Sequence, residues 1–108
     1  MHKYLTECIG TFFLVLTIGL ASSKAGNLAP LAISAALMVM TAAAFAGGAI
    51  SGGAFNPAVG TGPTIVHAVV HSDFSFEHLW LYLVGPFSGG VLAALVFLVQ
   101  EKGSNAPA

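Results

Sequence analysis

The stretch GGAISGGAFNPA, residues 47–58, lies between two long apolar runs and decides how the rest of the chain is interpreted. Its glycines precede Asn56 and Pro57. Asn is a favoured N-cap residue, and Pro fits the first helical position, where its missing N–H costs nothing. The stretch therefore predicts a glycine-rich entry followed by a helix that starts at Pro57.

This helix is expected to be short. It can continue only to about His71, because Ser72 and Asp73 form a polar break. A helix of that length does not cross a hydrocarbon core about 30 Å thick. We expect a re-entrant loop and half-helix over residues 47–71. Irregular backbone at membrane depth is tolerated where it lines a watery cavity, so the backbone of Gly52, Gly53 and Ala54 is expected to line a pore.

The composition indicates a membrane protein. Hydrophobic residues make up 56% of the chain and charged residues 6%, whereas soluble domains carry about a quarter charged residues. Three apolar runs, at about 4–21, 28–46 and 79–99, are long enough to span a bilayer. We expect an all-α, multi-pass protein of the cell membrane, with one domain over residues 1–103 and a flexible tail over 104–108.

The first run has a rival interpretation as a secretory signal peptide. Met1, His2 and Lys3 would form its basic leader, and residues 21–23 its cleavage site. Glu7 and Thr11 inside the run argue against this, because a cleaved leader gains nothing from a buried acid.

Residues 51–59, SGGAFNPAV, resemble the Asn-Pro-Ala signature of the aquaporin and aquaglyceroporin family. Glu7 and Thr11 resemble the Glu-x-x-x-Thr opening of the family's repeat, and Gly62-Pro63 resembles a pair that follows the motif. The last apolar run resembles the family's last span at Trp80, Tyr82, Gly85 and Pro86. The likeness covers about residues 4–100.

The resemblance implies a fold of two inverted repeats, each with three spans and one half-helix. This chain holds one such set, as a half-aquaporin would. We therefore expect an antiparallel homodimer, a form of inverted repeat common in transport proteins. Lys3 would lie on one side of the membrane and Lys24 and Lys102 on the other, a weak bias that permits insertion in both orientations.

The same resemblance implies a pore motif of Asn56, Pro57 and Ala58, with Glu7, Thr11, Gly62 and Pro63 as structural supports. Two half-helix N-termini meeting at the midplane would repel cations, because each carries about half a positive charge. The implied partners are water, small neutral solutes, the lipid bilayer and a second copy of the chain, with no cofactor.

The selectivity filter departs from that of water-selective members. They carry Arg directly after one Asn-Pro-Ala, where this chain has Val59. Matching along the motif puts Gly53, Ala44 and Ala36 at the other filter positions. Such a ring would be wide and nearly free of side-chain donors, so the expected solutes are water and/or small neutral molecules such as glycerol, urea or ammonia. Without the Arg, an ion-leaky pore is an alternative.

Other side chains keep two interpretations. Glu7 inside a span is either a proton relay or a support that fixes the glycine-rich loop through backbone N–H groups. His67 and His71 stand four apart, as in a metal site or pH gate, or make ordinary hydrogen bonds at the membrane boundary. Trp80 and Tyr82 are expected to be interface anchors, and Gly85 and Gly89 to allow close helix packing.

The alternative function is a non-conducting structural or regulatory membrane subunit that needs a partner channel. An enzyme is not expected, because no nucleophile–base pair or metal cluster falls at membrane depth. With a net charge of −1, the chain offers no basic patch for nucleic acid.

Overall fold

The protein is an all-α chain. The computed structural model describes residues 1–105, without the side chains of residues 24 and 25. Its elements are α1 (His2–Ala25), a 3₁₀ turn η1 (Gly26–Leu28), α2 (Ala29–Ser51), α3 (Pro57–His71) and α4 (Leu79–Ser104). Residues 1–105 contain no strand. Three segments are long and apolar enough to cross a membrane, namely His2–Ser23, Gly26–Ser51 and Leu79–Ser104. The expected all-α membrane fold is confirmed.

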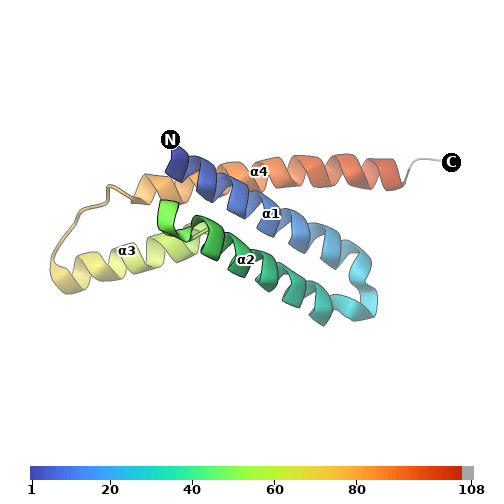
Figure 1. Cartoon of the computed structure of the whole chain (residues 1–108), viewed down its shortest axis with the longest axis horizontal. Coiled ribbons are helices and arrows are strands. Elements are labelled where there is room, and N and C mark those ends of the chain that lie inside the picture. The colour runs from blue at the N-terminus through green and yellow to red at the C-terminus, as the bar shows by residue number, and fades with distance from the viewer. Residues whose placement is uncertain (106–108) are drawn as a thin grey trace.

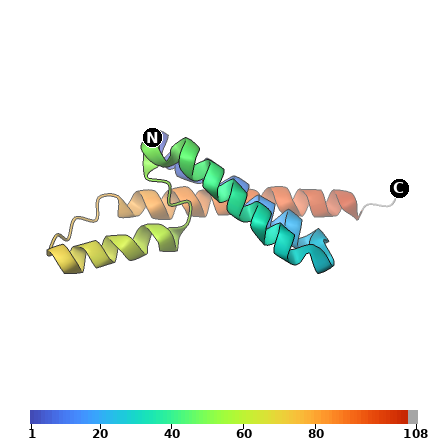
Figure 2. The ribbon, with the colours of Figure 1, turned by 60° about the horizontal axis from the view of Figure 1, so that its bottom comes forward.

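The four helices form an elongated molecule of about 60 × 27 × 22 Å. α1 lies between α2 and α4 and packs against both (Figure 1). α3 runs beside the first part of α4, and the chain between residues 72 and 78 returns to the start of α4 (Figure 2). Among the described residues, α4 is the helix that α3 packs against; α1 and α2 do not reach it.

Small residues set the close approach of α1 and α4. A Cβ added to Gly85 would lie 2.6 Å from Cβ of Glu7, and one added to Gly89 would run into the carbonyl oxygen of Cys8. A Cβ on Gly90, on another face of α4, would meet open space. Gly85 and Gly89 therefore let the two backbones pack closely, as their spacing predicts.

The expected apolar runs fall inside α1, α2 and α4, but α2 is longer than its run. It continues past residue 46 through Gly47 and Gly48 to Ser51. Gly47 is buried, and a Cβ added there would press on the methyl group of Thr6 in α1. The glycine therefore allows α1 and α2 to pack closely. Between α2 and α3, irregular backbone is confined to residues 52–56. In the tail expected over 104–108, Ser104 ends α4, and residues 106–108 lie outside the described part.

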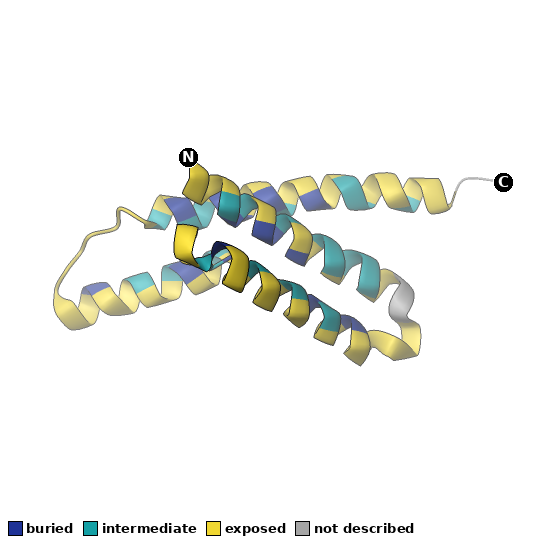
Figure 3. Cartoon of the chain, viewed as in Figure 1, coloured by how far each residue is buried: buried dark blue, intermediate teal, exposed yellow. Residues whose placement is uncertain are grey.

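The outward faces of the helices are apolar. On α2, the side chains of Leu37, Met38 and Phe45 are exposed, whereas the side turned to α1 buries small residues such as Ala32 and Ala36 (Figure 3). A water-soluble monomer rarely exposes so continuous an apolar surface. Lipid chains solvate such side chains well, as the three membrane spans require.

Candidate pore loop

The loop of residues 52–56 connects α2 to α3 and contains three residues with positive φ, namely Gly52, Gly53 and Phe55. α2 ends at Gly52, whose φ of 97° is left-handed and whose N–H donates to the Gly48 carbonyl oxygen at 2.8 Å. Gly53 has φ 69°, and Phe55 has φ 49° although it carries a side chain. Left-handed φ is easy for glycine and costs about 1 kcal/mol or more for other residues. Contacts around Phe55 must therefore hold the loop in place.

The carboxylate of Glu7 supplies the first set of these contacts. The residue is fully buried on α1, at 0% exposure. Its Oε1 accepts hydrogen bonds from Ser51 Oγ at 2.6 Å and Ala54 N at 3.1 Å, and its Oε2 accepts from Phe55 N at 2.6 Å. A buried charge is tolerated when hydrogen bonds replace its lost hydration. Glu7 therefore fixes the backbone N–H groups of Ala54 and Phe55, although it precedes them by more than forty positions.

Thr11, one turn further along α1, holds the same loop from its carbonyl side. Its Oγ1 donates to the Phe55 carbonyl oxygen at 2.9 Å. Glu7 and Thr11 thus bracket the peptide groups of Phe55, which explains why their spacing of one helical turn matters. The structure brings together these two predicted supports and the loop.

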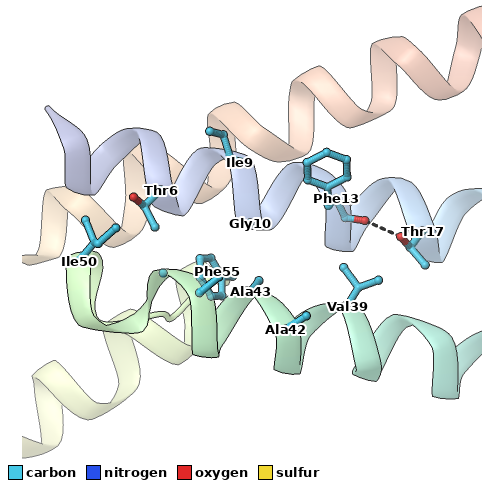
Figure 4. Close-up of a pocket in the computed structure, with 12 residues that line it drawn as sticks. Thr6, Ile9, Gly10, Phe13, Thr17, Val39, Ala42, Ala43, Ile50 and Phe55 are labelled. Atoms are coloured by element: carbon cyan, nitrogen blue, oxygen red, sulfur yellow. Dashed lines mark hydrogen bonds between the residues drawn. The ribbon is translucent and has the colours of Figure 1, made fainter.

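The Phe55 side chain is a further anchor, and the sequence interpretation did not single it out. It is 1% exposed, and its ring points into the space between α1 and α2 (Figure 4). Added Cβ atoms at Gly10 on α1 would overlap this ring, and one at Gly47 on α2 would lie 3.4 Å from it. Glycines at both positions leave room for the ring, and these two glycines are the sequence feature that could have indicated it. The ring is also part of the lining of an apolar groove of about 540 Å³ between α1 and α2.

Asn56 caps α3 as its sequence predicts. With φ −155° and ψ 126°, it is extended, and its Oδ1 accepts a hydrogen bond from Ala58 N at 2.8 Å. Pro57 takes the first helical position. Asn56 and Ala58 are exposed, and within residues 1–105 the Asn56 Nδ2 has no hydrogen-bond acceptor. The first turn of α3 therefore presents an amide donor and the positive end of a helix dipole outward.

Tyr82 joins the loop to α4, which differs from the interface anchor expected of it. Its hydroxyl donates to the Ser51 carbonyl oxygen at 3.0 Å, and its ring packs so closely on Gly60 of α3 that a Cβ there would overlap it. Trp80, by contrast, is 65% exposed. Because Tyr82 is held by α2 and α3 together, it is a connection inside the fold.

A hollow of about 540 Å³ lies between α3, the first turns of α4 and the loop, and is called the α3–α4 hollow below. Its lining includes these predicted pore, filter and support residues: Gly52, Gly53, Ala54, Val59 and Pro63. Pro63 has no N–H to give to the Val59 carbonyl one turn earlier, so this carbonyl lacks its helical partner. Gly62 is exposed on α3 and is not part of the lining.

The filter candidates divide into a cluster and an outlier. A Cβ on Gly53 would lie 3.6 Å from Cα of Ala44, so these two positions are neighbours. Val59, 51% exposed, shares the α3–α4 hollow with Gly53. Ala36 is buried at 5% exposure, two helical turns before Ala44 and on the side of α2 that packs on α1. The structure does not bring Ala36 to the other three.

Comparisons of the sequence with a family model and with individual proteins indicate the same family. Residues 1–97 match the model of the family described as Major intrinsic protein. The chain is 42% identical over 104 residues to a probable aquaporin TIP2-2 of Arabidopsis thaliana, a match that covers 94% of this chain and 39% of the relative. It is 37% identical over 99 residues to aquaporin TIP1-2 of Zea mays, covering 90% and 37% of the two chains. The chain thus spans less than two fifths of the length of these relatives. No solved structure gives a significant match.

Proposed function

The chain belongs to the major intrinsic protein family, and the relatives described above are named aquaporins. We therefore propose that it forms a passive membrane channel for water and/or small neutral solutes. The observation that carries the proposal is the pore loop. Glu7 and Thr11 hold it, and Asn56 caps α3 while its amide nitrogen stays free. A fixed helix N-terminus with outward donors is suited to bind water oxygens and to oppose cations.

The pore is proposed to need two inverted copies. Within the described residues, α3 contacts α4 and neither α1 nor α2. The α3 side chains Ile65, Val66, Val69 and Val70 are each more than half exposed. A second α3 meeting the first at Asn56 would enclose a passage between two capped helix ends. Inverted repeats around a midplane site are common in transport proteins.

The proposed solute range includes glycerol. Around the loop, Val59, Gly53 and Ala44 offer small or apolar side chains and no charged donor. A wide filter without such donors passes small polyols as well as water. The three spans support an integral membrane protein. We propose that it resides in the cell membrane. Fractionation of cells that express the tagged protein tests this location.

Reconstitution of the full chain in liposomes tests the channel. Stopped-flow light scattering under a sucrose gradient should show faster shrinkage than empty liposomes, with a low activation energy. A glycerol gradient should then give faster re-swelling. Val59→Trp should abolish both accelerations by filling the α3–α4 hollow, whereas Val66→Trp, on an exposed part of α3 outside the hollow, should keep them.

The alternative is a non-conducting structural or regulatory membrane subunit that needs a partner channel. Under it, verified and correctly inserted protein accelerates neither water nor glycerol. A full-length aquaporin whose flow changes when this chain is added, compared with the same aquaporin alone, would support that alternative and overturn the homodimeric pore.

A further inference from the structure

Two histidines on the last part of α3 form a close pair outside the pore loop. His67 and His71 are both exposed, and their ring centroids lie 4.6 Å apart with an interplanar angle of 42°. His71 ends α3, and Ser72 follows in a left-handed conformation. The two rings therefore lie close together at the end of α3. This end extends beyond the start of α4 (Figure 1).

We propose that His67 and His71 form a two-imidazole site for a divalent transition metal of the Cu²⁺ or Zn²⁺ class. Imidazole nitrogens coordinate such ions at about 2.0–2.1 Å. If the N–metal–N angle is between about 90° and 109°, the centres of two imidazole rings that bind the same ion lie roughly 4.5–5.2 Å apart. The observed separation falls at the lower end of this range, so the ion enters by rotation of exposed side chains, without backbone movement.

The ion would be held by two protein ligands and by water. Residues 1–105 contain no group of three or more His, Cys, Asp or Glu side chains that could hold a metal. Asp73 and His78 line the α3–α4 hollow together with His67 but are not part of such a group. An exposed two-ligand site is open and exchanges its ion readily. Among divalent ions, Cu²⁺ should bind most tightly.

The position of the pair links metal binding to flow, and this part rests on the proposed function. His67 lines the same hollow as Val59 and Gly53, two to three helical turns from the loop. A hydrated divalent ion on His67 and His71 would narrow the hollow and place positive charge at its rim. Cu²⁺ should therefore slow water and glycerol flow without unfolding the protein.

Direct binding of Cu²⁺ to the purified full chain tests the site independently of transport. All samples carry Cys8→Ser and His2→Gln, because a thiol or an N-terminal histidine also binds copper. Electron paramagnetic resonance should show two coordinated nitrogens, and His67→Gln or His71→Gln should weaken binding at least about tenfold. His78→Gln, in the same hollow, should bind like the parent. Unchanged binding in either pair variant, or equal loss in His78→Gln, overturns the proposal.

Flow measurements with the same proteins separate the two claims. In proteoliposomes that conduct water, Cu²⁺ should slow shrinkage, the chelator EDTA should restore it, and both pair variants should resist the block. Conduction that Cu²⁺ leaves unchanged, although the ion binds, overturns the block while keeping the site. Absence of conduction in all samples counts against the proposed channel, and the resonance experiment still decides the metal site.

Discussion

At the residue scale, a single buried acid organises the pore loop. Glu7 is surrounded by protein, yet three donors, Ser51 Oγ and two backbone N–H groups, point at its two oxygens. Donors fixed in a low-dielectric surrounding strengthen one another, and an unmatched donor there is costly. All three hydrogen bonds come from atoms of the loop or of α2. This favours a structural role of Glu7, in which it supports the loop, over a role as a proton relay.

Replacing Glu7 by Gln should destabilise the protein with little change in shape. The amide keeps one oxygen, but its NH₂ group faces a backbone N–H of Ala54 or Phe55 and leaves it unpaired. An unpaired buried donor costs about 1–3 kcal/mol. Thermal unfolding in detergent, followed by circular dichroism, should show a lower midpoint. Glu77→Gln, an exposed loop residue, is the matched control and should leave the midpoint unchanged. An equal midpoint for Glu7→Gln would show that the loop does not depend on the carboxylate.

Replacing Asn56 by Asp should make the pore more permeable to protons and other cations. Asp keeps an oxygen that can cap α3 through Ala58 N, but it removes the amide donors and adds a negative charge beside the helix N-terminus. We expect proton leak to rise about tenfold, equivalent to about 1.4 kcal/mol in the barrier. A pH-sensitive dye inside proteoliposomes measures it, with Asn27→Asp in η1 as the control. Equal leak in both variants would contradict the proposed role of the capped helix end.

At the element scale, packing of α1 against α4 positions the loop. Glu7 and Thr11 project toward the loop from α1, while Tyr82 reaches Ser51 from α4. The loop is correctly held only if the two helices keep their separation, which Gly85 and Gly89 set.

Adding a methyl group to α4, by Gly89→Ala, should test whether the protein depends on the close approach of α1 and α4. Gly89→Ala would push against the Cys8 carbonyl oxygen and lie 3.0 Å from Phe12 N, both backbone atoms that cannot rotate away. Overpacking of this kind costs about 1–3 kcal/mol. Gly90→Ala meets open space and should be neutral or slightly stabilising, because Ala favours helices. The two midpoints of thermal unfolding, compared in one detergent, check the prediction. Similar midpoints would mean that α1 and α4 adjust freely.

The elements themselves were predictable because their signals are local. Asn56 and Pro57 mark the start of α3, and the apolar runs mark the three spans. The support by Glu7 and Thr11 was reached through resemblance, since hydrogen bonds between residues 44 to 48 positions apart leave no periodic trace. For the same reason Phe55 was not singled out, and Tyr82 was expected at the membrane interface. The residues that contact them, Gly10, Gly47, Gly60 and Ser51, become their neighbours only in the folded chain.

At the scale of the whole molecule, one copy leaves the capped end of α3 uncovered. Asn56 and Ala58 are exposed, and within residues 1–105 no helix packs on the apolar face of α3 that is turned away from α4. Lipid can solvate the apolar side chains but offers no acceptor for the Asn56 amide in a hydrocarbon core. Water within a passage closed by a second copy satisfies that amide, which is why the proposed pore contains two chains.

Crosslinking at the two ends of α3 tests this assembly. With Cys8→Ser as background, Ala58→Cys stands in the first turn of α3 and Val69→Cys near its last, about 16 Å away along the axis. Both positions are exposed, so reactivity toward a small maleimide should be similar in detergent. If two half-helices meet end to end, a short bis-maleimide added to native membranes should capture dimers from Ala58→Cys and leave Val69→Cys monomeric. Dimers from both positions would indicate side-by-side packing of α3. Dimers from neither would remove the two-copy pore, because no second α3 would then lie near Asn56.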